Sequence, residues 1–289
     1  MRMHIDHVTI AGPDLNALRD SFAAAGLATD YGGPHSNGVT HMALLGFDDG
    51  AYIELISTIK PAGQTAPWWQ AAIAGSSGSC GWAVRVSDVG AETKRLRSEG
   101  VTVVGPMHMT RDRPDGRVVQ WDIAFPGEGG IAHAGATLPF FICDRTPRDW
   151  RVRPSASAAE APLTGVQRVV IGVRDLDASV RLFRRLYLLS EPRVGDHEPW
   201  HARLAMFDDS PVVLASPRDA HSWLGRRLQE FGELPCAYLL ATNNFDAARE
   251  TYALNELHEW FGQRIAWFEP GALRGTRLGV VRRNARPRV

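Results

Sequence analysis

The stretch of sequence that decides the fold runs from His4 to Leu15 and reads HIDHVTIAGPDL. Its β-branched and apolar residues predict a strand. Asp14 then predicts the start of a helix, because an aspartate side chain accepts hydrogen bonds from the free N–H groups of a first turn. A second stretch, FDDGAYIEL from Phe47 to Leu55, predicts a turn followed by another strand. We therefore expect residues 4–57 to form a βαβββ unit.

The same two stretches return later in the chain. RVVIGVRDL, from Arg168 to Leu176, stands 161 residues after His7–Leu15, and FDDSPVVL, from Phe207 to Leu214, stands 160 residues after Phe47–Glu54. Two blocks repeated at nearly one offset indicate an internal duplication. Weaker strand-and-cap patterns begin near residues 82 and 238, so four such units are expected.

These repeats suggest how the chain is divided. We predict an N-terminal domain over 1–149, a linker over 150–164 that is rich in alanine, serine and proline, and a second domain over 165–289. The expected fold class is α+β, built from four tandem βαβββ units.

Composition excludes several classes of protein. The chain has 289 residues, 44% of them hydrophobic and 22% charged, which is typical of a soluble globular protein. Its formal net charge is zero, so nucleic acid is not an expected partner. The chain has no apolar run long enough to span a membrane and no apolar signal core. Three widely spaced cysteines read as free thiols, which favours a reducing, cytoplasmic compartment.

His7 and Glu54 are the leading candidate site residues. Imidazole and carboxylate are common ligand types for divalent metals, and a carboxylate in the apolar segment around Glu54 is costly to bury unless it is paired. The alternatives are a core histidine and a glutamate on the solvent face of its strand. In the repeat, Arg168 and Leu214 take these two positions, so the second copy cannot bind a metal with them.

Other residues are candidates for substrate contact. His35 follows the loop residues Gly32, Gly33 and Pro34, and His41 lies on the next predicted strand, as a metal ligand or a substrate contact. Trp121 could line a cavity, although a tryptophan is more often an ordinary core residue. Arg111 and Arg113 could meet an anionic substrate, although loop arginines are usually solvated.

The chain resembles the vicinal oxygen chelate superfamily, and within it the glyoxalase-like domain family. The residues that carry the resemblance are Ile5–Val8, Gly32–His35, Thr40, Tyr52–Leu55, Trp121 and Leu138–Ile142. The resemblance implies that pairs of units form cups, here two pseudo-symmetric ones, with a metal held by three or four ligands. In this chain, however, the second unit's ligand positions fall at Gly81 or Trp82 and near Phe141 or Cys143, and glycine and phenylalanine cannot ligate.

Two functions follow from the resemblance and these residues. The first is a metal-dependent lyase or isomerase acting on a small oxygenated metabolite, in which His7 and Glu54 hold a divalent ion (Zn, Ni, Mn or Fe) and Glu54 or a nearby carboxylate moves a proton. The second is a metal-free protein that sequesters a small molecule against Trp68, Trp69, Trp121 and Phe141. We favour the enzyme. The second domain would stabilise or cover the first, or form a homodimer.

Overall fold

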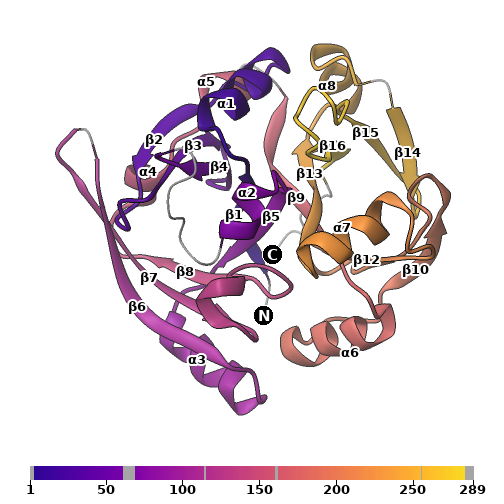
Figure 1. Cartoon of the computed structure of the whole chain (residues 1–289), viewed down its shortest axis with the longest axis horizontal. Helices are drawn as coiled ribbons and strands as arrows, with labels where there is room; N and C mark the ends of the chain where they lie inside the picture. Colours follow the sequence, from indigo (N-terminus) through magenta and orange to yellow (C-terminus); the bar gives the residue numbers. More distant parts are fainter. Residues whose placement is uncertain (1–2, 61–68, 114, 160–161, 255, 284–289) are drawn as a thin grey trace.

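The chain folds into two curled sheets of eight strands each. The computed structural model describes residues 3–60, 69–113, 115–159, 162–254 and 256–283. The strand order is β2-β3-β4-β1-β5-β8-β7-β6 in the first sheet and β10-β11-β12-β9-β13-β16-β15-β14 in the second. Figure 1 shows the two halves side by side, the first in indigo to magenta and the second in orange to yellow.

The first sheet contains two βαβββ units. Its elements are β1 (His4–Ala11), α1 (Leu15–Ala24), β2 (Asp30–Pro34), β3 (Thr40–Gly46), β4 (Tyr52–Thr58), α2 (Gln70–Ala74), β5 (Gly78–Arg85), α3 (Val89–Ser98), β6 (Val103–Asp112), β7 (Val118–Pro126), η1 (Gly130–His133) and β8 (Phe140–Asp144). In each unit the first strand pairs in parallel with the last, β1 with β4 and β5 with β8. The two units join where β1 and β5 run antiparallel.

The second sheet repeats this arrangement. Two short helices, α4 (Arg148–Arg151) and α5 (Ala156–Ala159), connect the halves, and the remaining elements are β9 (Leu163–Gly172), α6 (Leu176–Tyr187), β10 (Arg193–His197), η2 (Glu198–Trp200), β11 (Ala202–Met206), β12 (Val212–Pro217), α7 (Trp223–Phe231), β13 (Pro235–Thr242), α8 (Phe245–Thr251), β14 (Glu256–Trp260), β15 (Gln263–Trp267) and β16 (Leu278–Arg282). The identical strand order confirms the predicted duplication.

The predicted helix starts are correct in all four units. The side chains of Asp14, Asp88, Asp175 and Asn244 each accept a hydrogen bond from a backbone N–H in the first turn of α1, α3, α6 and α8. Each cap ends an apolar strand and sets the direction of the helix that follows. Because each cap acts within its own turn, the start of each helix can be predicted from the local sequence alone.

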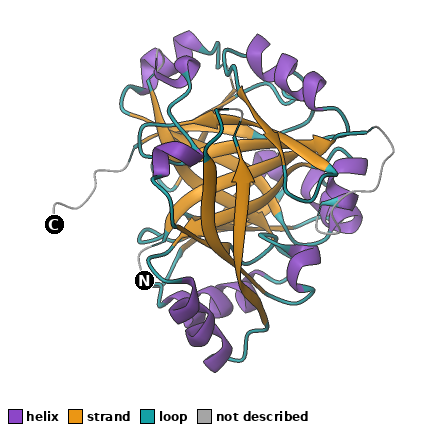
Figure 2. Ribbon diagram, turned by 90° about the vertical axis from the view of Figure 1, so that its left-hand side faces the viewer, coloured by secondary structure: helices purple, strands orange, loops and turns teal. Residues whose placement is uncertain are grey.

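The main core lies between the sheets and the helices. Alternation along β1 sends Val8 and Ile10 into this core and leaves His7 and Thr9 for the opposite face of the strand. Figure 2 shows the strands in the interior and the helices around the outside. Described residues from both halves contribute to this one core, and the hydroxyl of Tyr238 on β13 lies 2.9 Å from the carbonyl oxygen of Thr9.

The interior of the second sheet is filled with aromatic side chains. Trp200, Trp260 and Trp267 pack there against Val213 and Ala215 of β12. The sequence offset puts Leu214 at the Glu54 position, but Leu214 lies in the main core instead. The register is therefore displaced by one residue, and a one-residue shift moves a side chain to the other face.

Arg168, at the His7 position of the repeat, is buried. Its guanidinium donates hydrogen bonds to the carbonyl oxygens of Phe207 and Ser210, which lie at the turn before β12. Arg168, which occupies the His7 position, thus stabilises a turn in the second sheet. No helix among the described residues is long and apolar enough to cross a membrane.

Candidate active site

The first sheet encloses a cavity of about 110 Å³. Most of its wall is apolar or aromatic, and its polar lining comes from histidines, a glutamate, arginines and a short polar turn. The lining residues are His7, His35, Ser36, Asn37, Met42, Tyr52, Glu54, Trp69, Met109, Arg111, Trp121, Ile123, Phe125, Phe140, Ile142 and Arg151. An apolar cavity with a few converging polar groups is the usual form of a small-molecule site.

His7 and Glu54 meet at this cavity because their strands are neighbours. β1 and β4 pair in parallel, with Thr9 opposite Glu54 and His7 opposite Tyr52. The Nε2 atom of His7 lies 3.3 Å from an oxygen of Glu54, and the two residues are only 3% and 4% exposed to solvent. The direct pairing of the two strands is what brings the side chains together.

His35 completes a cluster around Glu54. Its Nε2 atom lies 3.0 Å from the second oxygen of Glu54, so the carboxylate has one imidazole on each oxygen. The Nδ1 atom of His35 lies 2.9 Å from the hydroxyl of Thr40, which fixes the orientation of the ring. When His35 donates from Nε2 to the carboxylate, its Nδ1 accepts the proton of the Thr40 hydroxyl.

Glu54 is ionised in this setting. Burial alone raises the pKa of Glu54, but the hydrogen bond from His35 and the positive charges of His35, His7 and Arg111 outweigh it and lower the pKa below its usual value. The cavity therefore holds a buried carboxylate that carries its charge at neutral pH.

Asp6 and Arg148 hold His7 from behind. The Nδ1 atom of His7 lies 2.8 Å from one oxygen of Asp6, and Arg148 donates to the other oxygen at 2.7 Å. Burial raises the pKa of Asp6, yet the His7 hydrogen bond and the charges of Arg148 and Arg151 hold it well below the usual range. An ionised Asp6 accepts a hydrogen bond from Nδ1 of His7 and so holds the ring with Nε2 toward Glu54.

Aromatic side chains form the walls on either side of His7. The ring of Tyr52 stacks on the imidazole with centroids 4.6 Å apart, and Phe140 meets it edge-on at 5.2 Å. The prediction that Phe141 lines the cavity is wrong, since Phe141 is fully buried in the main core. Phe140 and Ile142 take the cavity face of β8, again a displacement of one residue.

Other predicted contacts divide between the two faces of the sheet. Trp121, on β7, lines the cavity and is not an ordinary core tryptophan, the reading the sequence had favoured. Trp69 also lines the cavity, and its ring centroid is 5.9 Å from that of His35. Trp68 lies outside the described residues. The prediction that His41 contacts the site is wrong: it alternates with Met42, which lines the cavity, and its ring meets Tyr31 instead.

Arginines supply the rest of the polar lining. Arg111 lines the cavity, although a solvated arginine was the default expectation, whereas Arg113 pairs with Asp115 and does not line this cavity. Arg151 also lines the cavity, and its guanidinium lies 4.4 Å from the ring centre of Trp121. Sequence reasoning missed Arg151, which sits in the segment expected to be a linker, because nothing local marks it as different from its neighbouring arginines.

The residues that are present do not form a complete metal centre. His7 and Glu54 are suitable ligand types, but Ala83 of β5 and Phe140 of β8 stand beside His7 where further ligands would be needed. Among the described residues, no group of three or more histidine, cysteine, aspartate and glutamate side chains is arranged to hold a metal ion. Instead, both oxygens of Glu54 face imidazole nitrogens.

Comparison with known proteins identifies the family. The sequence pattern of the glyoxalase-like domain matches residues 5–187, which span the whole first sheet and continue through α6. The chain belongs to the glyoxalase-like domain family. It is thereby a member of the vicinal oxygen chelate superfamily, as its sequence resemblance implied. A comparison with curated proteins found no match.

One solved structure shares the fold over nearly the whole chain. A hypothetical protein from Staphylococcus aureus is 15% identical, with a TM-score of 0.65 over 97% of this chain and 99% of the other. Methylmalonyl-CoA epimerase from Mycobacterium tuberculosis is 17% identical, with a TM-score of 0.38 over 43% of this chain and 91% of its own. The Streptomyces coelicolor epimerase is 24% identical, with a TM-score of 0.37 over 43% and 99%. At 15% identity the likeness to the Staphylococcus aureus protein concerns the fold alone.

Proposed function

We propose that the cavity of the first sheet is the active site of an isomerase or lyase that moves a proton on a small oxygenated metabolite, with Glu54 as the base. The observation that supports this most is the position of Glu54: a buried, ionised carboxylate between His7 and His35, at a cavity with apolar walls. Perturbed titratable groups gathered at a cavity are typical of catalytic sites.

In the proposed reaction, Glu54 takes a proton from a carbon next to a carbonyl group of the substrate. The C–H bond breaks, its electron pair forms a carbon–carbon double bond, and the carbonyl electron pair moves onto oxygen. The N–H of His35 then stabilises that oxygen. Return of the proton from Glu54 to a carbon gives an isomer. In a lyase reaction the carbonyl re-forms instead, the electron pair of the carbon–carbon double bond moves to make a double bond to the next carbon, and the group on that carbon leaves with its bonding electrons and takes the proton from Glu54.

The same contacts explain how Glu54 could become a stronger base when substrate binds. The hydrogen bond from His35 is the leading contribution that lowers the pKa of Glu54, while burial raises it. A substrate oxygen that takes over the N–H of His35 removes this contribution. Burial then dominates, the pKa of Glu54 rises, and proton transfer becomes more favourable.

A divalent ion at His7 and Glu54, as expected from the sequence, is the alternative form of this enzyme. Such an ion would act as a Lewis acid on the substrate oxygen. It would need further ligands beyond these two side chains, and the described residues do not supply them. The mechanism proposed above therefore uses only the side chains.

A second candidate function is binding without catalysis. The mainly apolar wall, with Trp69, Trp121 and Phe140, favours retention of an aromatic or aliphatic molecule. In that case Glu54 and its histidines would orient the ligand and no covalent bond would change.

One experiment separates these functions. The protein, purified with and without chelator, is incubated in D₂O with a panel of small 2-oxo and 2-hydroxy acids, and deuterium incorporation is followed by NMR while metal content is measured. Exchange that survives chelation supports the proton-transfer enzyme, and exchange that requires a near-stoichiometric metal supports the metal-dependent form. Tight binding of a panel member without exchange would contradict catalysis and favour the binder.

A further inference from the structure

A second cavity adjoins the candidate active site. It has a volume of about 340 Å³ and shares two lining residues, Arg111 and Arg151, with the first cavity. Arg113 and Arg153 also line it, and Asp30 is its one acidic lining residue. The Asp30 carboxylate already accepts a hydrogen bond from Ser155 at 2.6 Å. The two cavities therefore meet at two guanidinium groups, and four arginines but only one aspartate line the outer cavity.

Arg111 is a partly buried cation that makes no direct ion pair with a carboxylate among the described residues. Its two Nη atoms donate to the carbonyl oxygen of Arg151 at 3.0 Å and to the sulfur of Met42 at 3.6 Å, both uncharged acceptors. Among the residues that the structure describes, no carboxylate lies within ion-pair distance of Arg111, and its buried Nε has no partner. Burying a guanidinium in this way is costly unless a negative charge compensates for it.

Arg151 presents a second unsatisfied donor at the same wall. Its Nε pairs with Asp144 at 2.6 Å and its plane covers Trp121, which together fix the guanidinium in place. The residue is only 5% exposed, yet its Nη2 atom has no partner among the described residues. Two neighbouring guanidinium groups that line both cavities, one of them almost fully buried, are suited to binding an oxyanion.

We propose that Arg111 and Arg151 form an anion subsite, which binds a phosphate or carboxylate group carried by the substrate. The apolar part of that molecule lies in the inner cavity and brings its reacting carbon to Glu54. This inference rests on the proposed function, because it names the substrate class of the same site: a small molecule with an apolar body and an oxyanion at one end.

The subsite can be tested without knowing the substrate. The probes are phenyl phosphate, phenylacetate, inorganic phosphate and benzyl alcohol, titrated calorimetrically at constant ionic strength into wild type, Arg111→Met and Arg203→Met. Arg203 is exposed on β11 of the second sheet, so its replacement is the matched control for loss of one positive charge. Methionine keeps the length and apolar stem of Arg111, and circular dichroism checks that the variant is folded.

Phenyl phosphate or phenylacetate should bind wild type and Arg203→Met equally, and Arg111→Met about tenfold or more weakly, as expected for loss of a charge-assisted hydrogen bond. The tighter of the two probes identifies the oxyanion as phosphate or carboxylate. Three results would overturn the proposal. Benzyl alcohol could bind as tightly as both anions, or the anions could bind Arg111→Met as tightly as wild type. Inorganic phosphate could also bind Arg111→Met and Arg203→Met equally. Glu54→Gln should still bind the anions. Loss of catalysis in Glu54→Gln and loss of anion binding in Arg111→Met are therefore separate results, which test the proposed function and the anion subsite independently.

Discussion

Asp6 and His7 are neighbours in sequence, and their side chains nevertheless share a buried hydrogen bond of 2.8 Å. Successive side chains of a regular strand point to opposite faces and cannot meet in this way. The register between β1 and β5 shifts between Ile5 and His7, so β1 is irregular at this point. Such an irregularity re-aims side chains, and here it turns Asp6 to orient the imidazole that faces Glu54.

Asp6→Asn should destabilise the protein. The change leaves Arg148 and His7 without the negative charge that both contact in the buried interior. Removing one partner of a buried ion pair costs about 3 kcal/mol or more. Urea unfolding measures this loss, with the exposed Asp20→Asn as the control, which should change the free energy of unfolding by less than about 0.5 kcal/mol. Equal stability of the two variants would show that the Asp6 network contributes nothing.

Tyr238→Phe should weaken the contact between the two halves. The Tyr238 hydroxyl lies within hydrogen-bonding distance of the carbonyl oxygens of Thr9 and Gly81, at 2.9 and 2.8 Å, across the junction. Removing a buried hydroxyl that has partners costs about 1–2 kcal/mol. Tyr187 is the matched control, because its buried hydroxyl has no partner among the described residues. Thermal unfolding should show a lower Tm for Tyr238→Phe and little change for Tyr187→Phe; the reverse order would argue against this junction.

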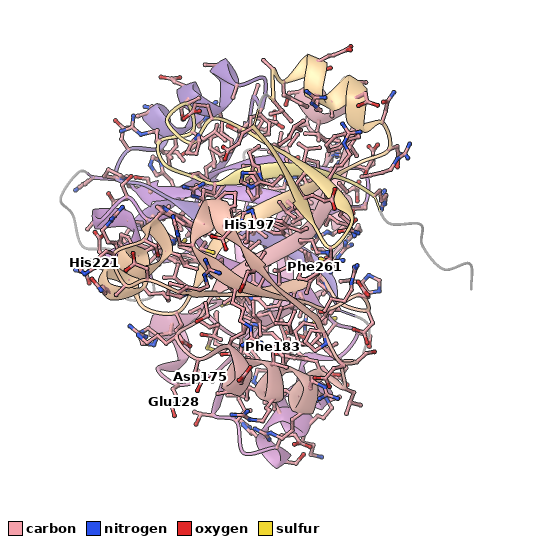
Figure 3. All side chains as sticks on the ribbon, turned by 90° about the vertical axis from the view of Figure 1, so that its right-hand side faces the viewer. Glu128, Asp175, Phe183, His197, His221 and Phe261 are labelled. Atoms are coloured by element: carbon pink, nitrogen blue, oxygen red, sulfur yellow. The ribbon has the colours of Figure 1, made fainter. Side chains whose placement is uncertain are left out.

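The second sheet should make the protein sensitive to acid. His197, labelled in Figure 3, ends β10 and packs among Trp200, Trp260 and His258. Burial, with the charges of His258 and Arg277, lowers the pKa of His197 from 6.5 to about 4. Below pH 6.5 the unfolded chain therefore binds a proton that the folded protein does not, and the free energy of unfolding falls as pH drops from 6.5 toward 4.

This acid sensitivity is measured as Tm between pH 7 and pH 4.5. His197→Phe keeps a ring but cannot be protonated, so its Tm should fall less than that of wild type over this range. His221, exposed in the same half and also labelled in Figure 3, provides the control His221→Phe, which should behave as wild type. A pH dependence identical in all three proteins would remove His197 as the source.

Local patterns allowed the units and their helix starts to be predicted from sequence. Asp14 and Asp175 act within their own turns, so no tertiary information was needed to place them. Which face of the sheet a side chain occupies was harder to predict where polar and apolar residues do not alternate along the strand. Around Phe140 and Phe141 every residue is apolar, and the sequence therefore contains no signal for which of the two faces the cavity.

The buried polar network could not be predicted from sequence in the same way. Asp6 and Arg148 are 142 residues apart in the sequence. They meet only because the fold places the start of α4, which follows β8, beside β1. The sequence around Arg151 does not distinguish it from an exposed helical arginine, and only the tertiary structure shows that it lies over Trp121. Residue type pointed to His7, His35 and Glu54, because imidazoles and carboxylates are chemically distinctive, but it pointed equally to His41, which lies on the other face of its strand. Arginines are abundant in this chain and gave no such signal.

The central claim, that Glu54 is the base, is tested most directly by the deuterium exchange rate of Glu54→Gln. Glutamine keeps the size of the side chain and its hydrogen bonding but cannot accept a proton. With the panel member that wild type exchanges fastest, the rate should fall by about a hundredfold or more. Ligand binding should remain close to wild type, and circular dichroism should show that the variant is folded. The exposed Glu259→Gln should retain the full rate. Exchange by Glu54→Gln at the wild-type rate would contradict the account.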